Sequence, residues 1–215
     1  MAMTAPSSSD LTRAPLTMFS EEEELFRAAV ADLAESEVRP RVRAMEDAGQ
    51  IDPALTAKFV ELGLMGIELP DEFGGGGGSL MMVAIAVEEL SKVDASAAIQ
   101  VDVQNTLVNY PLYRYGNAEQ RARILPRMTA GTIGAYALSE PGSGSDAAAL
   151  KASARLDGDH YVLNGTKQFI SGAGVNDLYV CMVRTGDEKA KGISCIVVEK
   201  DTPGLSFGAP EKKLG

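Results

Sequence analysis

The sequence has little of what metal and disulfide sites need. Its 215 residues include one histidine, His160, and two cysteines, Cys181 and Cys195. One histidine and two separated cysteines cannot build a metal cluster, so no metal site is expected. A disulfide framework needs more cysteines and a secretory signal. Both cysteines lie in apolar runs (LYVCMV and ISCIVV), and we expect two buried, reduced thiols.

Long apolar runs and positive charge are also scarce. No run is long enough to span a membrane, and the first residues lack the apolar segment of a signal peptide. We therefore expect a cytoplasmic protein with no membrane partner. The chain has 20 Lys and Arg against 30 Asp and Glu, a formal net charge of −10. Because nucleic-acid binding needs clustered Lys and Arg, nucleic acid is not expected as a partner.

The composition that remains is that of a folded globular chain. Hydrophobic residues make up 45% and charged residues 23% of the sequence, which is enough for a core. The spacing of apolar residues changes from a helical period to a strand period near residue 133. We expect an α+β fold: a disordered lead-in over 1–17, an N-terminal helical bundle over 18–132, and an antiparallel β-domain over 133–215 that is incomplete.

Local signals refine the helical part. Ser20 and Glu23 form a capping box, and Pro40 should stop or kink the helix that follows. The glycines at 74–78 lack the Gly-Lys-Ser or Gly-Lys-Thr of a phosphate loop, so a flexible turn is expected there. An apolar helix should cover about 95–113. Further helix starts are expected at Asp52, Ser79 and Asn117.

Strand patterns fill the second part. The expected strands cover 136–140, 150–156, 160–170, 178–185, 192–200 and 205–212. Asn164-Gly165 is typical of a type I′ hairpin turn between two of them.

The stretch YALSEPGSGSD at 136–146 has the composition of a ligand-binding turn. A strand runs into Pro-Gly and then into small residues with free backbone N–H groups. A planar ligand could lie against such a strand and meet those donors, and Ser139 and Ser145 add short hydroxyls. On the residues alone, however, an ordinary Gly/Ser turn is the more common explanation.

A second stretch, KQFISGA at 167–173, pairs an aromatic with a hydroxyl. If it is a strand, Phe169 and Ser171 lie on one face, because side chains alternate. That arrangement suits a flavin, whose ring could pack on Phe169 while the hydroxyl reaches its polar edge. Taken alone, the stretch is better explained by a core aromatic and a serine at a strand end.

Together, and in this order after a helical half, the two stretches resemble the acyl-CoA dehydrogenase family. The family pattern TEPGAGSD appears as SEPGSGSD at 139–146, followed at matching spacing by LNGTKQFISGA at 163–173 and DTPGLSFG at 201–208. PDEFGG at 70–75 matches a family turn, and QNTLVN at 104–109 is most similar to short/branched-chain members. The resemblance covers nearly the whole chain from Ser20.

The resemblance implies FAD as cofactor and α,β-dehydrogenation of a short or branched acyl-CoA. Phe169 stands where many members have Trp against the flavin, and Ser171 where they have Thr. Ser145 would meet the acyl-CoA substrate as well as the cofactor. The positions that the resemblance assigns to the cofactor are Tyr136, Leu138, Ser139, Ser145, Phe169, Ile170 and Ser171.

In the family the general base is a Glu of a C-terminal helical domain. That domain is expected to be absent here, so no catalytic residue is assigned and the isolated chain should be inactive. The resemblance also implies electron-transfer flavoprotein as acceptor and a homotetramer for the complete protein. Two alternatives stay open: a non-catalytic acyl-CoA or flavin-binding module, and an acyl-CoA oxidase-type flavoenzyme on the same fold.

Overall fold

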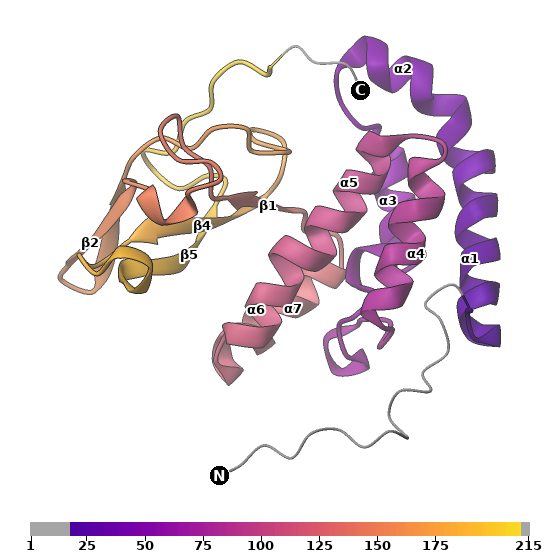
Figure 1. Ribbon diagram of the computed structural model, residues 1–215, viewed down its shortest axis with the longest axis horizontal. Helices are drawn as coiled ribbons and strands as arrows, with labels where there is room; N and C mark the ends of the chain where they lie inside the picture. Colours follow the sequence, from indigo (N-terminus) through magenta and orange to yellow (C-terminus); the bar gives the residue numbers. More distant parts are fainter. Residues whose placement is uncertain (1–17, 212–215) are drawn as a thin grey trace.

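A computed structural model describes residues 18–211 of the chain. The expected lead-in over 1–17 and the last four residues lie outside the described residues. Helices occupy the chain from Glu21 to Thr129, and strands begin at Gly134 (Figure 1). The expected order, a helical part followed by a β part, is confirmed.

The helical part has seven α-helices within the described residues: α1 (Glu21–Leu33), α2 (Val42–Ala48), α3 (Pro53–Glu61), α4 (Leu80–Ser91), α5 (Ala95–Asp102), α6 (Tyr110–Tyr115) and α7 (Ala118–Thr129). Two π-helical segments, η2 (Ala34–Val38) and η6 (Val103–Asn109), follow α1 and α5. Each precedes a proline, Pro40 or Pro111, whose missing N–H breaks the α-helical ladder. The chain therefore continues past Pro40 through a 3₁₀ turn, η3 (Arg39–Arg41), into α2.

The helix starts expected from the sequence are confirmed. Ser20 Oγ accepts from Glu23 N at 3.2 Å, and the Glu23 carboxylate accepts from Ser20 N at 2.8 Å. Asp52, Ser79 and Asn117 cap α3, α4 and α7 through their side-chain oxygens. These helices enclose an apolar core whose members include the fully buried Leu55, Phe59, Leu90 and Val101.

The glycine run does not form a flexible turn. Gly76, Gly77 and Gly78 donate backbone hydrogen bonds of 3.0, 2.9 and 2.7 Å to the carbonyls of residues 66, 69 and 67. A Cβ on Gly75 would stand 2.0 Å from the Leu69 carbonyl oxygen. Only glycine allows this close approach of two backbone segments, so the run is pinned to the segment before it.

The β part is one five-stranded sheet: β1 (Gly134–Ala137), β2 (Ser153–Asp157), β3 (His160–Asn164), β4 (Leu178–Arg184) and β5 (Ile193–Glu199). β4 pairs in parallel with β1 and β2, and antiparallel with β5; β2 and β3 form an antiparallel hairpin. The sheet is thus mixed and not purely antiparallel. The long connection from β1 to β4 permits the parallel pairing, which no short turn could make.

Three local expectations in the β part are wrong. The hairpin turns at Gly158-Asp159, because Asp157 pairs with His160, and Asn164-Gly165 merely ends β3. Residues 165–170 are not a strand: Gly165 and Phe169 have φ values of 149° and 58°. Residues 205–211 also form no strand.

The sheet uses its two faces differently. Tyr136, Val180 and Val197 lie in register on one face and pack with Val108 and Leu125 of the helical part. The opposite face carries Val183, Cys181 and Ile196, which cluster with Ala152, just before β2, and with Ala154 of β2. Figure 1 shows the consequence, with the sheet lying beside α6 and α7.

One buried glutamine joins the helical part to β1. Gln104 of η6 is fully buried, and its Oε1 accepts from Gly134 N at 2.9 Å. Its Nε2 donates to the Thr132 carbonyl at 3.2 Å. Both backbone groups lie where β1 begins, so η6 fixes the start of the strand that leads into the candidate site.

Candidate functional site

β1 leads directly into a tight turn formed by the SEPGSGSD stretch. Glu140 and Ser143 exchange two backbone hydrogen bonds, of 2.8 and 3.1 Å, with Pro141-Gly142 at the tip. The buried Ser143 then donates from Oγ to the Asp146 carbonyl at 2.8 Å. Gly144 and Ser145 are exposed between these fixed points. The turn is therefore well defined, and Ser145 projects from it.

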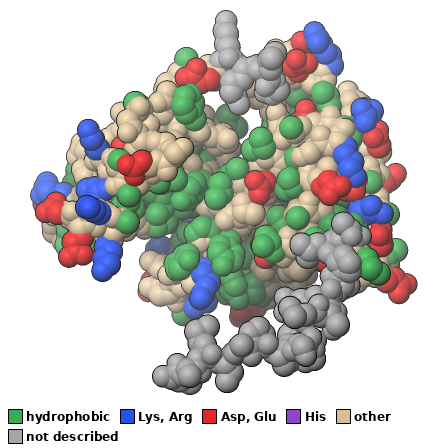
Figure 2. All heavy atoms as spheres, in the orientation of Figure 1, with side chains coloured by type: hydrophobic (Ala, Val, Ile, Leu, Met, Phe, Trp, Pro, Cys, Tyr) green, Lys and Arg blue, Asp and Glu red, His purple; other side chains and the backbone are tan. Residues whose placement is uncertain are grey.

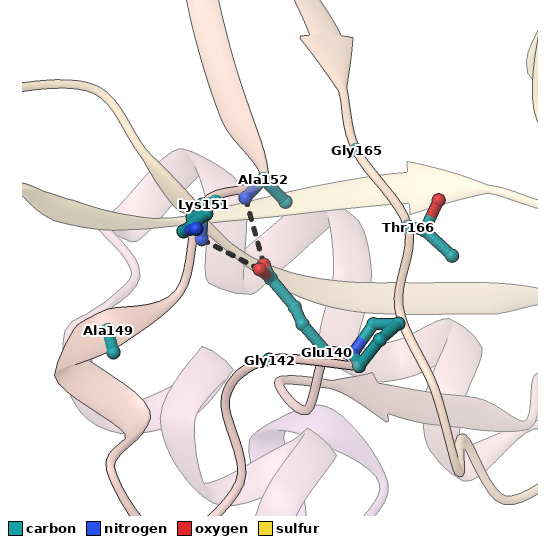
Figure 3. A pocket seen from close by; sticks show the side chains of 8 residues that line it. Glu140, Gly142, Ala149, Lys151, Ala152, Gly165 and Thr166 are labelled. Atoms are coloured by element: carbon teal, nitrogen blue, oxygen red, sulfur yellow. Dashed lines mark hydrogen bonds between the residues drawn. The ribbon is translucent and has the colours of Figure 1, made fainter.

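The Glu140 side chain connects this turn to the segment before β2. Figure 3 shows its carboxylate facing Lys151 and Ala152. It accepts from Lys151 N at 2.7 Å and from Ala152 N at 2.9 Å. Lys167 Nζ donates to it at 2.8 Å. Burial alone would raise the pKa of Glu140, but these hydrogen bonds outweigh burial and hold its pKa below the usual range. With three donors engaged, this carboxylate is not free to act as a base.

The two stretches singled out in the sequence meet in space. Gln168 N donates to the Ser139 carbonyl at 2.8 Å, and Lys167 Nζ donates to the Leu138 carbonyl at 2.9 Å. We call the segments 138–146 and 167–171, joined by these contacts, the junction. Six of the seven predicted cofactor residues belong to the junction; the seventh, Tyr136, lies two residues before it on β1.

Phe169 is not a core residue. Its side chain is 73% exposed, and its backbone is left-handed, with φ at 58°. A bulky residue with positive φ is strained, and such strain gathers at functional sites. Ser171 is exposed and Ile170 half-buried. The expected common strand face of Phe169 and Ser171 is not formed, because this segment is a loop.

The loop after Ser171 is held by a buried tyrosine. Tyr179 of β4 accepts from Gly174 N at 2.9 Å and donates from its hydroxyl to the Asn176 carbonyl at 3.1 Å. Its ring also lies against Phe207, with centroids 5.3 Å apart. These contacts fix the far end of the loop that begins at Ser171.

Backbone donors are left free at the junction. Among residues 18–211, no hydrogen bond uses the backbone N–H of Gly144, Ser145 or Ser171. Tyr136, half-buried on the helix-facing side of β1, has its pKa raised, chiefly by burial and then by the nearby Cys195. Its phenol therefore stays protonated at neutral pH and can donate. A planar cofactor with a polar edge requires an aromatic ring for its face and hydrogen-bond donors for its edge. The exposed aromatic, the free N–H groups and the short hydroxyls are groups of these two kinds.

A separate cavity of about 270 Å³ lies behind the turn (Figure 3). Glu140, Gly142, Lys151, Gly165 and Thr166 are among the residues that line it, whereas Ser145, Phe169 and Ser171 do not. Cofactor sites typically enclose roughly 300–1,000 Å³, so this cavity is small for a dinucleotide. Of the predicted residues, Ser145, Phe169 and Ser171 are exposed, and the others are half-buried. Figure 2 shows hydrophobic side chains gathered where the sheet meets the helices.

Sequence reasoning missed Lys167 and Arg184. The Arg184 guanidinium donates to the carbonyls of Ala148, Leu150 and Lys189 at 2.8, 3.2 and 2.8 Å. It thereby fixes the segment that follows Ser145. The only sequence signal was a cation at the end of the apolar run 178–183, because its acceptors are backbone carbonyls, and those of Ala148 and Leu150 lie more than 30 positions away.

The cysteines differ from expectation. Both are free, but Cys195 is exposed and only Cys181 is partly covered. Residues 18–211 contain no group of three or more His, Cys, Asp or Glu side chains that could hold a metal ion. The helices in this part of the chain are too short or too polar to cross a membrane.

Comparison with known proteins defines the class. The family model "Acyl-CoA dehydrogenase, N-terminal domain" matches residues 20–132, and "Acyl-CoA dehydrogenase, middle domain" matches 135–215. The chain therefore belongs to the acyl-CoA dehydrogenase family, whose members are FAD-dependent oxidoreductases.

Individual relatives agree with this assignment. The mitochondrial short/branched chain specific acyl-CoA dehydrogenase of Bos taurus is 40% identical, over 94% of this chain and 47% of its own length. Butyryl-CoA dehydrogenase from Megasphaera elsdenii has a TM-score of 0.84 at 31% identity, over 91% of this chain and 53% of that one. Glutaryl-CoA dehydrogenase from Mycobacterium smegmatis, in complex with FADH2, has a TM-score of 0.84 at 30% identity, over 91% and 50%. The chain spans about half the length of these relatives.

Proposed function

We propose that this chain supplies the flavin-contacting part of an FAD-dependent dehydrogenase that acts on a short or branched acyl-CoA thioester. One observation carries the proposal. The junction joins the segment of the exposed, left-handed Phe169 to the segment that holds the free N–H groups of Gly144 and Ser145, and the two segments together carry three predicted serine hydroxyls, although they are distant in sequence. A structural core would bury Phe169 and would satisfy those donors.

Each predicted residue then has a distinct task. Phe169 offers its ring to one face of the cofactor, while Ile170 and Leu138 supply apolar contact. Ser139 and Ser171 offer hydroxyls to its polar edge, and Tyr136 offers a phenol. Ser145 meets the phosphate-bearing part of the cofactor and of acyl-CoA. FAD, when bound, supplies the hydride acceptor, and the protein supplies orientation and electrostatics.

The base that removes the α-proton is not assigned within the described residues. Glu140 is engaged by Lys167 and two backbone donors. Glu89, the other buried glutamate, pairs with Lys92 at 2.7 Å. We propose that the base comes from outside these 215 residues. On this proposal, the chain alone binds the cofactor without turnover.

Several properties of the whole protein stay predictions. They are a homotetrameric assembly, electron-transfer flavoprotein as electron acceptor and a cytoplasmic location. An oxidase-type flavoenzyme on the same fold differs in one measurable property, the reactivity of its reduced flavin with oxygen.

The test is FAD titration followed by flavin fluorescence. The chain should bind FAD weakly but measurably, and Ser145→Phe should weaken binding more than folding, because the backbone must approach the ligand closely there. Ser153→Phe is the matched control, an exposed serine of β2 where an aromatic suits a strand. Equal FAD affinity in Ser145→Phe and in the unchanged chain would mean that the turn is only a turn.

A further inference from the structure

We propose that Lys167 is a positioning residue for the flavin-binding surface: held by Glu140, its ammonium sets the separation of the two segments of the junction. The inference rests on the proposed function and goes beyond it, since Lys167 itself need not touch the cofactor.

The geometry places Lys167 between the two segments. Its Nζ donates to the Leu138 carbonyl at 2.9 Å and to Glu140 Oε1 at 2.8 Å. The next residue, Gln168, donates from its backbone N–H to the Ser139 carbonyl at 2.8 Å. Three consecutive residues of the first segment are thus tied to two consecutive residues of the second.

This ion pair is unlike the others in the described chain. The side chains of Lys167 and Glu140 are only 14% and 7% exposed. Every other ion pair among residues 18–211 has at least one partner more than 30% exposed. Surface pairs contribute little, whereas breaking a buried pair leaves a charge without compensation.

The Glu140 carboxylate is itself held in place by other hydrogen bonds. Besides Lys167, Glu140 accepts from Lys151 N and Ala152 N, at 2.7 and 2.9 Å. The acceptor is thus anchored to the two residues before β2, and the ammonium cannot move without losing its contacts with both Glu140 and Leu138. Lys167 is therefore held in one position, and it transmits that position to the segment that follows it.

The segment that follows needs such support. Phe169 has its strained φ of 58° two residues after Lys167. Strained backbone persists only where the surroundings over-determine it. Upstream of Phe169, the contacts are those of Lys167 and Gln168; downstream, Ala173 N donates to the Ile170 carbonyl at 3.1 Å. Loss of the Lys167 contacts leaves Phe169 free to relax and moves the donor at Ser171.

The test compares the chain with Lys167→Met and with Arg155→Met as matched control. Arg155 of β2 pairs with Asp157 at 3.1 Å, but both side chains are exposed. Two quantities are measured: amide hydrogen exchange without FAD, and FAD affinity with the visible spectrum of bound flavin. Lys167→Met should speed exchange at Gln168 but not in α4, weaken FAD binding roughly tenfold or more, and change the flavin spectrum at saturation. Arg155→Met should leave all of them unchanged.

A double-mutant cycle with Glu140→Gln shows whether Lys167 acts through the pair. The two effects on FAD affinity should be strongly non-additive, because either change breaks the same contact. If Lys167→Met does not fold, Lys167→Gln, which keeps a donor for Leu138, takes its place. Failure of both to fold would make Lys167 a folding residue and overturn the inference.

The remaining outcomes separate this inference from the proposed function. Unchanged FAD affinity in Lys167→Met, with the unchanged chain binding FAD, overturns the positioning role alone. Faster exchange spread evenly over all helices and strands, with affinity falling only as the folded fraction falls, also overturns it. Absence of FAD binding by the unchanged chain overturns the proposed function and, with it, the role of Lys167 toward flavin.

Discussion

Arg127, in the last turn of α7, donates two hydrogen bonds to the carboxylate of Glu199 at the end of β5, at 2.7 and 3.0 Å. The side-chain hydrogen bond raises the pKa of Arg127 and lowers the pKa of Glu199. The pair joins the helical part to the sheet at a surface where both side chains are about half exposed. Solvent screening therefore limits what it contributes.

Arg127→Met should lower the free energy of unfolding by about 0.2–1 kcal/mol near neutral pH, and by less in high salt. Glu199 has a lower pKa in the folded than in the unfolded chain. The stabilisation is therefore present above its unfolded pKa and is lost as pH falls through the folded pKa. Urea unfolding at pH 7 and near pH 3 measures it. Arg114→Met is the control, because Arg114 is exposed and forms no ion pair within residues 18–211. A difference of equal size at both pH values would contradict the pairing.

Gly134 and Val108 meet where the helical part touches β1. A Cβ on Gly134 would stand 2.4 and 2.9 Å from the two methyl carbons of the fully buried Val108. Gly134→Ala should therefore destabilise the chain by about 1–3 kcal/mol through overpacking. The double variant Gly134→Ala with Val108→Ala should lose less stability than the sum of the losses in the two single variants, because Val108→Ala makes room for the new methyl group.

Urea unfolding of the four chains measures this coupling. Gly208→Ala is the control, since a Cβ there meets nothing within 4 Å. Full additivity of the two changes would show that the contact does not limit packing at this interface.

The two cysteines should differ in reactivity toward a thiol reagent. Burial raises the pKa of Cys181 to about 11, so at pH 8 only about one molecule in a thousand carries the thiolate there. Burial also raises the pKa of Cys195, but its side chain is exposed. At pH 8 the chain should show a faster and a slower thiol; Cys195→Ala should remove the faster one and Cys181→Ala the slower. The reverse assignment would contradict the placement of β5.

The sequence predicted what short-range chemistry decides. The caps at Ser20, Asp52 and Asn117 formed as expected, because a side-chain oxygen satisfies N–H groups two or three residues away. The mixed strand directions were missed, because they depend on how β1 and β4 pair across a long connection. The left-handed backbone at Phe169 was missed too, since its alternation pattern fits a strand equally well.

The candidate site was only partly predictable. Its residues were found by resemblance, because Ser145 and Phe169 belong to recognisable stretches. The Glu140–Lys167 pair was not found, because its partners are 27 positions apart in the sequence. What distinguishes the pair is that both side chains are buried, which the sequence does not show. The division between residues 132 and 133 stays a prediction that the change of spacing supports.

We propose that this chain supplies the flavin-binding surface and that the catalytic base comes from outside its 215 residues. The most direct measurement is turnover of butyryl- or 2-methylbutyryl-CoA with an artificial electron acceptor, by the purified chain with FAD. Alone, the chain should show little or no activity, since losing a positioned base costs roughly a hundred- to ten-thousand-fold in rate. Adding the C-terminal half of a short/branched-chain relative should restore turnover. Robust turnover by the chain alone would contradict the claim, because a carboxylate within residues 1–215 would then be the base.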